Sequence, residues 1–145
     1  AYGGARIGGT NEKEARELEK MATNVGLGFQ IWDDYLDATA SEDVLGKPSG
    51  SDIRQGKRTL LVIEALNRAN SEQRKRLLEI LDSENNDDDI IEAVKIMDDC
   101  GALKECHKQA NQYLEGARKI LLKYPESEAR TLFEELLEYM VTRGH

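Results

Sequence analysis

The sequence is poor in cysteine, proline and aromatic residues. Its 145 residues include two cysteines and two prolines, and 6% are aromatic. Cys100 and Cys106 match no C-x₂-C zinc pattern and are poorly placed for a local disulfide on helical segments. We expect both to be ordinary, partly buried thiols. His107 and His145 have no sequence neighbours that suggest catalysis.

Long apolar runs and an excess of basic residues are missing too. No run approaches the roughly eighteen apolar residues that a membrane span needs, and no charged-then-apolar leader opens the chain, so we expect a cytoplasmic protein. The net charge of −8 argues against nucleic acid as the main partner, because phosphate backbones attract basic surfaces. A protein this acidic that binds a diphosphate must use local lysines, a metal ion, or both.

Strand signals are scarce, since no segment alternates apolar and polar residues for long. The sequence therefore predicts an all-α fold in a single domain, residues 1–145. A long helix should run from Thr10-Asn11 to about Ala38, followed by a loop rich in glycine and serine to about Gln55. Shorter helices should then cover about Arg58–Ala69, Ser71–Leu81, Asp87 to just before Gly101, Ala102–Lys123 and Glu126–Arg143.

Apolar side chains at three- and four-residue steps predict the buried faces of the first and last long helices. In the first helix they are Leu18, Met21, Val25, Phe29, Trp32 and Leu36, and in the last they are Leu132, Phe133, Leu136, Leu137, Met140 and Val141. The acidic run from Ser83 to Asp89 precedes another apolar run and fails the calcium-loop pattern. We interpret it as the acidic N-terminus of a helix.

The segment from Gly26 to Asp37 carries the chemistry. Four polar residues, Gln30, Asp33, Asp34 and Asp37, stand among Phe, Ile, Trp, Tyr and Leu, and their spacing places them within one arc of a helix. Burying three carboxylates without a counter-charge is very unfavourable, so this face either opens to water or holds cations. Asp33 and Asp37 lie one helical turn apart, and a pair of carboxylates at this spacing suits a Mg²⁺ ion that is shared with a phosphate.

A solvent-facing acidic stripe is the alternative explanation for this pattern, but the apolar flanks differ from the Glu/Lys mixture of an exposed face. Gly26 and Gly28 lie inside the same helix at a propensity cost of about 1 kcal/mol each, which suggests close packing or a neighbour that needs room. The loop that follows contributes glycines together with Lys47 and Lys57. It is not a P-loop, but it could supply donors to the phosphate that a metal bridges.

The strings FQIWDDYLD and GKPSGSDIRQGKRTL resemble the second aspartate-rich region of the trans-prenyl diphosphate synthases. The family pattern is roughly G-x-x-F-Q-x-x-D-D-x-x-D, then G-K-x-x-G-x-D-I-x-x-G-K-x-T. The matching positions are Gly26, Phe29, Gln30, Asp33, Asp34, Asp37, Gly46, Lys47, Gly50, Asp52, Ile53, Gly56, Lys57 and Thr59. The resemblance implies the C-terminal part of an antiparallel helical bundle of the isoprenoid synthase type.

The same resemblance implies an ionisation-first prenyl transfer from an allylic diphosphate to isopentenyl diphosphate. Asp33, Asp34 and Asp37 would hold Mg²⁺, and Lys47 and Lys57 would contact the allylic diphosphate. Gln30 would stabilise the developing cation, and Phe29 would line the cavity. Asp52 would anchor the loop. Family members form homodimers, so a homodimer is expected as well.

A complete synthase also has an earlier aspartate-rich motif, N-terminal helices with a pocket for isopentenyl diphosphate, and a Lys-Thr pair. None of these occurs in the sequence, so we expect the chain alone to be inactive. Two other functions stay open. The chain could be a non-catalytic helical partner in a two-component synthase, or a terpene cyclase-like protein, although cyclases usually mix Asn, Ser or Thr into this motif. A purely structural helical bundle would explain the helices but not the motif.

Overall fold

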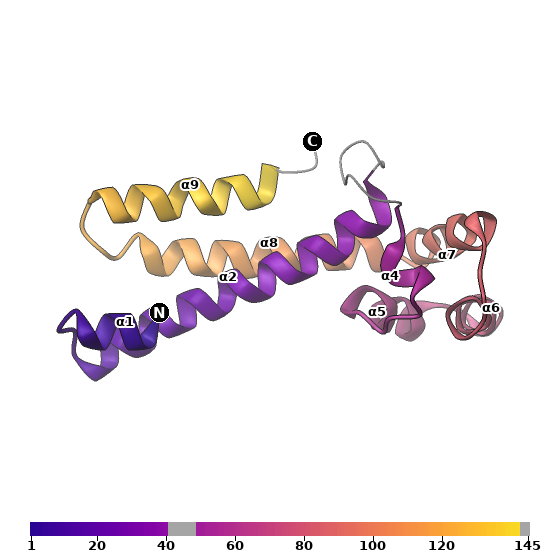
Figure 1. The fold of residues 1–145 in the computed structure, drawn as a ribbon, viewed down its shortest axis with the longest axis horizontal. Coiled ribbons are helices and arrows are strands. Elements are labelled where there is room, and N and C mark those ends of the chain that lie inside the picture. Colours follow the sequence, from indigo (N-terminus) through magenta and orange to yellow (C-terminus); the bar gives the residue numbers. More distant parts are fainter. Residues whose placement is uncertain (41–48, 143–145) are drawn as a thin grey trace. The chain divides into compact units, whose positions relative to one another are not determined.

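The computed structural model describes residues 1–40 and 49–142, and every helix or strand that it has within them is an α-helix (Figure 1). The helices are α1 (Tyr2–Ile7), α2 (Glu12–Thr39), α4 (Ser51–Arg54), α5 (Leu60–Arg68), α6 (Ser71–Asp82), α7 (Asp87–Asp99), α8 (Ala102–Leu121) and α9 (Glu128–Thr142). The predicted all-α fold is confirmed. Among these residues, no helix has the length and apolar character to cross a bilayer.

Side-chain caps fix where several helices begin. The Asn11 carboxamide oxygen accepts a hydrogen bond from the backbone N–H of Glu14 at 3.0 Å and so starts α2. Asn70 and Asn86 form capping boxes at the starts of α6 and α7. The three aspartates of Asp87–Asp89 lie in the first turn of α7, where carboxylates stabilise a helix. The acidic run is therefore a helix N-terminus, as predicted.

Two helices were not predicted. The glycine-rich opening forms α1, whose Tyr2 hydroxyl donates to Glu12 at 2.8 Å and whose Arg6 donates to the Thr10 carbonyl at 2.7 Å. These contacts outweigh the low helix propensity of glycine. The predicted loop after Thr39 contains the one-turn helix α4.

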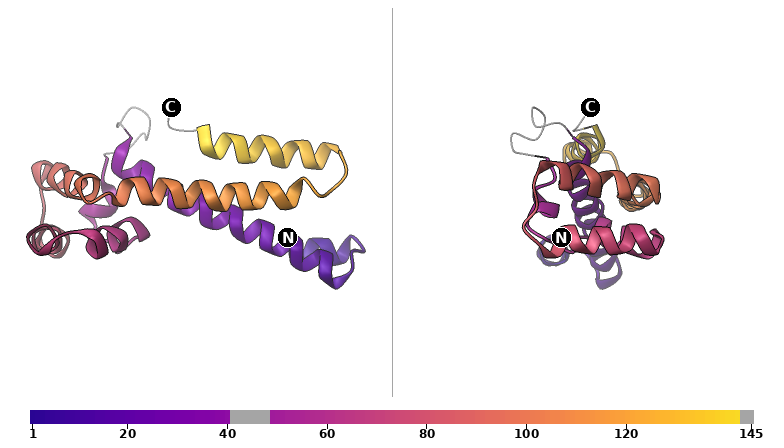
Figure 2. Two further views of the ribbon diagram at one scale, coloured as in Figure 1. Left: turned by 180° about the vertical axis from the view of Figure 1, so that it is seen from behind. Right: turned by 90° about the vertical axis from the view of Figure 1, so that its right-hand side faces the viewer.

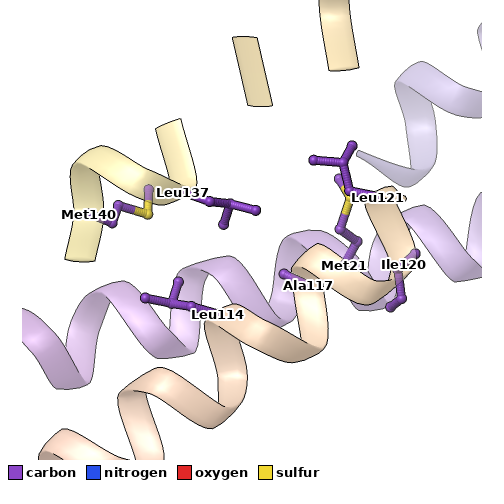
Figure 3. Packing of buried hydrophobic residues seen from close by; sticks show 7 residues of the cluster. All are labelled: Met21, Leu114, Ala117, Ile120, Leu121, Leu137 and Met140. Atoms are coloured by element: carbon purple, nitrogen blue, oxygen red, sulfur yellow. The ribbon is translucent and has the colours of Figure 1, made fainter. Parts of the chain in front are cut away.

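Contacts divide the described chain into two compact units, and the first contains residues 1–30 and 109–142. Its core consists of seven buried residues from α2, α8 and α9 (Figure 3): Met21, Leu114, Ala117, Ile120, Leu121, Leu137 and Met140. Leu18, Val25 and Phe29 pack against this cluster, so this part of the predicted apolar stripe of α2 does face a core.

The predicted inner face of α9 is partly wrong. Leu137 and Met140 are buried, but Leu132, Phe133 and Leu136 are 58%, 44% and 42% exposed. The physical reason is that the unit's core meets α9 only along the strip that carries Leu137 and Met140. The neighbouring apolar side chains lie outside this strip.

The second unit consists of Ile31–Lys108, in which α4, α5, α6 and α7 pack on one another (Figure 2). Trp32 from α2 is its largest fully buried side chain, and Leu36 is buried as well, so the stripe of α2 is confirmed here too. Other fully or almost fully buried core residues are Ile53, Val62, Leu77, Ile80, Met97 and Cys106.

Close packing explains one of the two glycines inside α2. A Cβ on Gly28 would lie 2.8 Å from Leu114 Cγ and 3.2 Å from the Ala110 carbonyl oxygen, whereas a Cβ on Gly26 would meet no atom within 4 Å. Gly28 therefore lets α2 and α8 approach closely inside the first unit, and Gly26 has no such role among the described residues.

We expect Gly28→Ala and Gly26→Ala to change stability in opposite directions. Gly28→Ala should lower the free energy of unfolding by about 1–3 kcal/mol, because the new methyl group overpacks the helix contact. Gly26→Ala should raise it by up to about 1 kcal/mol through helix propensity. Urea unfolding followed by circular dichroism measures both. Equal destabilisation by the two variants would contradict this assignment.

We expect the native fold to protect the Cys106 thiol from thiol reagents. Both cysteines are free, and Cys106 is fully buried. Burial, followed by the charges of Glu64 and Asp34, raises the pKa of Cys106 to about 11. Since the thiolate is the reactive form, Cys106 should resist thiol reagents at pH 8 in the native protein and react in urea. The variant Cys100→Ser isolates its signal, and equal labelling rates with and without urea would refute the expectation.

Candidate active site

The three aspartates of the DDxxD motif lie on α2 in the second unit, and they differ sharply in exposure. Asp33 is exposed to solvent, whereas Asp34 and Asp37 retain 8% and 3% of their accessible surface. These two are the only buried charged residues among those described. Because a buried carboxylate without partners is very unfavourable, the surroundings of Asp34 and Asp37 have to account for their burial.

Hydrogen bonds from the following loop account for Asp37. Its Oδ1 accepts a hydrogen bond from the Ser51 hydroxyl at 2.6 Å, and its Oδ2 accepts one from the backbone N–H of Asp52 at 2.9 Å. The Asp37 carbonyl oxygen also accepts from the N–H of Gly50 at 2.6 Å. Asp37 thus satisfies a donor in the first turn of α4, as an N-cap side chain usually does. The cap comes from a distant part of the sequence.

Two glycines fit this loop against the rest of the second unit. Gly50 has φ = +71° and Gly56 has φ = +64°, a conformation that side chains rarely adopt. A Cβ on Gly50 would collide with Ile90 of α7, and one on Gly56 would lie 2.5 Å from the Leu81 carbonyl oxygen of α6. Ile53 between them is 2% exposed. The loop is therefore held by packing as well as by Asp37.

Cations at the end of this loop pair with carboxylates. The Lys57 ammonium lies 2.5 Å from Asp52 Oδ1. The backbone N–H of Lys57 donates to the backbone carbonyl oxygen of Asp52 at 2.9 Å. Arg58 pairs with Asp82. The Lys57 and Arg58 side chains are 51% and 38% exposed, so both pairs are open to solvent. Exposed pairs of this kind are weak.

Asp34 faces the interior of the second unit, where Cys106 lies close enough for its pKa to respond to the carboxylate. The same surroundings include Glu64, which accepts a hydrogen bond from Arg68 at 3.0 Å. Arg68 also lies 3.3 Å from Glu105. The pKa of Arg68 is raised, mainly by its hydrogen bond with Glu64. Arg68 thus compensates the charges of Glu64 and Glu105 within the second unit.

An aromatic group anchors the motif's helix. The Trp32 ring stacks on Tyr35 at 5.4 Å between centroids and lies 5.1 Å from the His107 ring, and Tyr35 and His107 are 5.5 Å apart. Such contacts fix the helical register of α2 relative to α8 within this unit. His107, which the sequence alone left without a role, is part of this packing.

The remaining predicted site residues are placed as follows. Gln30 is exposed, and Phe29 is half-buried and packs against the core of the first unit. Lys47 lies outside the described residues. Sequence reasoning assigned no role to Ser51, although serine just before Asp52-Ile53 is a signal for the start of a helix. The predicted roles of Gln30, Phe29, Lys47, Lys57 and the aspartates stay predictions.

The described residues contain no cluster of three or more His, Cys, Asp or Glu side chains arranged to hold a metal ion by themselves. Mg²⁺ usually keeps several waters and takes one or two carboxylates together with substrate phosphates. Among the three motif aspartates, Asp33 is exposed, whereas Asp34 and Asp37 are buried.

Comparisons with known proteins identify the family of this chain. The sequence profile described as polyprenyl synthetase matches residues 2–97. A short chain isoprenyl diphosphate synthase of Methanothermobacter thermautotrophicus is 39% identical over 98% of this chain and 43% of its own length. Heptaprenyl diphosphate synthase component 2 of Geobacillus stearothermophilus is 32% identical over 98% of this chain and 43% of its own.

Solved structures agree. The geranylgeranyl pyrophosphate synthetase of Pyrococcus horikoshii superposes with a TM-score of 0.86 at 37% identity, over 93% of this chain and 41% of that one. The Corynebacterium glutamicum geranylgeranyl pyrophosphate synthase, solved with isoprenyl diphosphate and magnesium, gives 0.85 at 27% identity, over 97% and 40%. The chain spans less than half the length of these relatives and has the isoprenoid synthase fold over that span. It belongs to the polyprenyl synthetase family.

Proposed function

We propose that this chain provides the part of a prenyl diphosphate synthase that binds Mg²⁺ and an allylic diphosphate. The observation that carries the proposal is the hydrogen-bonded link between the DDxxD helix and the loop that ends at Lys57. It connects carboxylates, which attract a metal ion, to an ammonium group, which attracts a phosphate. Family membership supports the same function, because the similar proteins are named as isoprenyl diphosphate synthases.

The metal would be held through the DDxxD motif. The family pattern implies Asp33, Asp34 and Asp37 as ligands, and the exposed Asp33 is the first candidate for direct contact with the ion, because both Asp37 carboxylate oxygens already accept hydrogen bonds. When bound, Mg²⁺ would neutralise charge on the departing diphosphate. The similar synthase of Corynebacterium glutamicum was solved with magnesium, which supports a divalent ion here.

The lysines would contact the diphosphate of the allylic substrate. Lys57 would exchange its contact with Asp52 for one with a phosphate oxygen, a charge-assisted hydrogen bond. Lys47 would act with it, as the family pattern implies. The exposed amide of Gln30 would stabilise positive charge on the allylic group once the diphosphate leaves.

The overall reaction would be the head-to-tail condensation of an allylic diphosphate with isopentenyl diphosphate. The bond between the allylic carbon and the diphosphate oxygen breaks, the double bond of isopentenyl diphosphate attacks the allylic cation, and a proton is lost. The chain lacks the earlier aspartate-rich motif, so by itself it should not turn over substrate. Substrate binding and catalysis are then separable, and binding is the property to measure on this chain.

A second candidate is a subunit of a two-component synthase. The similarity to a protein named component 2 of heptaprenyl diphosphate synthase favours it. Under this alternative, the sequence would act only with a separate polypeptide. Co-purification of a second polypeptide would support this role, and a longer reading frame encoding both halves would exclude it.

We expect this chain to bind a non-ionisable allylic diphosphate analogue in the presence of Mg²⁺ and not in EDTA. Asp33→Asn should weaken Mg²⁺-dependent binding at least about tenfold, since it removes a charged ligand while keeping the shape of the side chain. Isothermal titration calorimetry measures both effects. Asp98→Asn is the matched control, because Asp98 is an exposed aspartate on α7. Binding that is indifferent to Mg²⁺ and to Asp33→Asn would refute the proposed site.

Removing the Lys57 ammonium should weaken analogue binding and reduce its dependence on salt. We expect Lys57→Ala to lower the affinity about tenfold, as the loss of one charge-assisted hydrogen bond would do. The titration is repeated at several NaCl concentrations, with Lys95→Ala, another exposed lysine, as control. If both variants lose the same affinity, Lys57 has no specific contact with the diphosphate.

A further inference from the structure

Asp37, the last aspartate of the DDxxD motif, has its carboxylate engaged in hydrogen bonds within the protein. Both of its carboxylate oxygens accept hydrogen bonds from the loop, one from the Ser51 hydroxyl and one from the Asp52 N–H. The residue is 3% exposed, whereas Asp33, one turn earlier on α2, is open to solvent. Both residues are aspartates of the same motif, but one is exposed and the other is buried.

The donors that Asp37 engages belong to a short chain of contacts that leads to Lys57. Asp52, whose N–H bonds to Asp37, contacts the Lys57 ammonium through its own carboxylate at 2.5 Å. The Asp52 carbonyl oxygen accepts the Lys57 N–H at 2.9 Å. Asp52 thus joins Asp37 to Lys57 through both its backbone and its side chain. Moving Asp52 would move the lysine.

We propose that Asp37 is a positioning residue, which holds α4 through Ser51 and Asp52 and so sets the place of Lys57 for the allylic diphosphate. This inference rests on the proposed function, because Lys57 has a role only if a diphosphate binds. It assigns to Asp37 a task different from that of Asp33: the carboxylate of Asp33 would bind the metal ion, whereas that of Asp37 holds Ser51 and Asp52 in place.

Substitutions at Asp37 and Ser51 separate this role from metal ligation. Asp37→Asn removes the charge, but its amide can still accept from the Asp52 N–H and donate to Ser51 Oγ. Asp37→Ala removes both hydrogen bonds, Ser51→Ala removes one, and Ser51→Thr restores a hydroxyl. A ligand role predicts that loss of charge is decisive, whereas a positioning role predicts that loss of the hydrogen bonds is decisive.

The test measures prenyl transfer by the complete protein in which this sequence occurs. Steady-state kinetics give the KM for the allylic diphosphate and kcat, and Mg²⁺ is titrated at saturating allylic substrate. We expect Asp37→Ala to raise the KM at least about tenfold and Ser51→Ala about threefold, with Ser51→Thr close to wild type. Asp37→Asn should keep the wild-type half-saturating Mg²⁺ concentration, and Asp33→Asn should raise it.

Non-additivity gives a further check. If Asp37 and Ser51 act as one unit, adding Ser51→Ala to Asp37→Ala should raise the KM little beyond that of Asp37→Ala alone. Should Asp37→Ala fail to fold, the variants Asp37→Asn, Ser51→Ala and Ser51→Thr still decide the question. The proposal is overturned if Asp37→Asn shifts the Mg²⁺ requirement as much as Asp33→Asn does, or if Ser51→Ala leaves the KM unchanged.

Hydrogen exchange separates a failure of this inference from a failure of the proposed function. Amides of residues 50–57 should exchange faster in Ser51→Ala and Asp37→Ala than in wild type, and at the wild-type rate in Asp33→Asn. Wild-type protein without Mg²⁺-dependent transfer, but with this exchange pattern, would refute the function and leave the loop anchor in place. Active wild type with unchanged exchange in the Asp37 and Ser51 variants would refute the anchor and leave the function standing.

Discussion

Burial of carboxylates on one apolar helix is the constraint around which the second unit is organised. A buried carboxylate needs hydrogen-bond donors or a counter-charge, and the described core has two such residues, Asp34 and Asp37. For Asp37 the donors come from Ser51 and Asp52, so the charge that must be satisfied on α2 dictates where the chain returns after Thr39. Residues 50–52 are held against α2 because the aspartate requires partners.

This requirement also explains features that look unrelated in the sequence. The returning segment must approach α2, α6 and α7 at once, and only glycine tolerates the positive φ values and the close contacts at positions 50 and 56. The burial of Ile53 between these glycines adds apolar area to the same junction. Backbone, packing and charge therefore agree on one conformation for residues 50–56.

Sequence reasoning succeeded where local rules decide the structure. The start of α2 near Asn11, the acidic first turn of α7 and the apolar stripe of α2 follow from side chains within one or two turns. It failed where distant residues decide. The helix α4 depends on a cap from Asp37, which is fourteen residues away from Ser51, and the exposure of Leu132 and Phe133 depends on which neighbours α9 has. Neither fact is contained in the periodicity of the segment itself.

The two glycines of α2 show how far packing can explain a motif. Both lower helix propensity by a similar amount, yet only Gly28 is required by a neighbour, and Gly26 faces open space among the described residues. Gly26 shares a helical face with Gln30, four residues later, and with Asp33, three residues further on, and all three are exposed. A Cβ on Gly26 would meet no atom of the described chain within 4 Å, so packing does not explain this glycine. If the proposed function is right, an allylic diphosphate that approaches Asp33 could use the room that Gly26 leaves, and the glycine would then serve binding and not the stability of this chain.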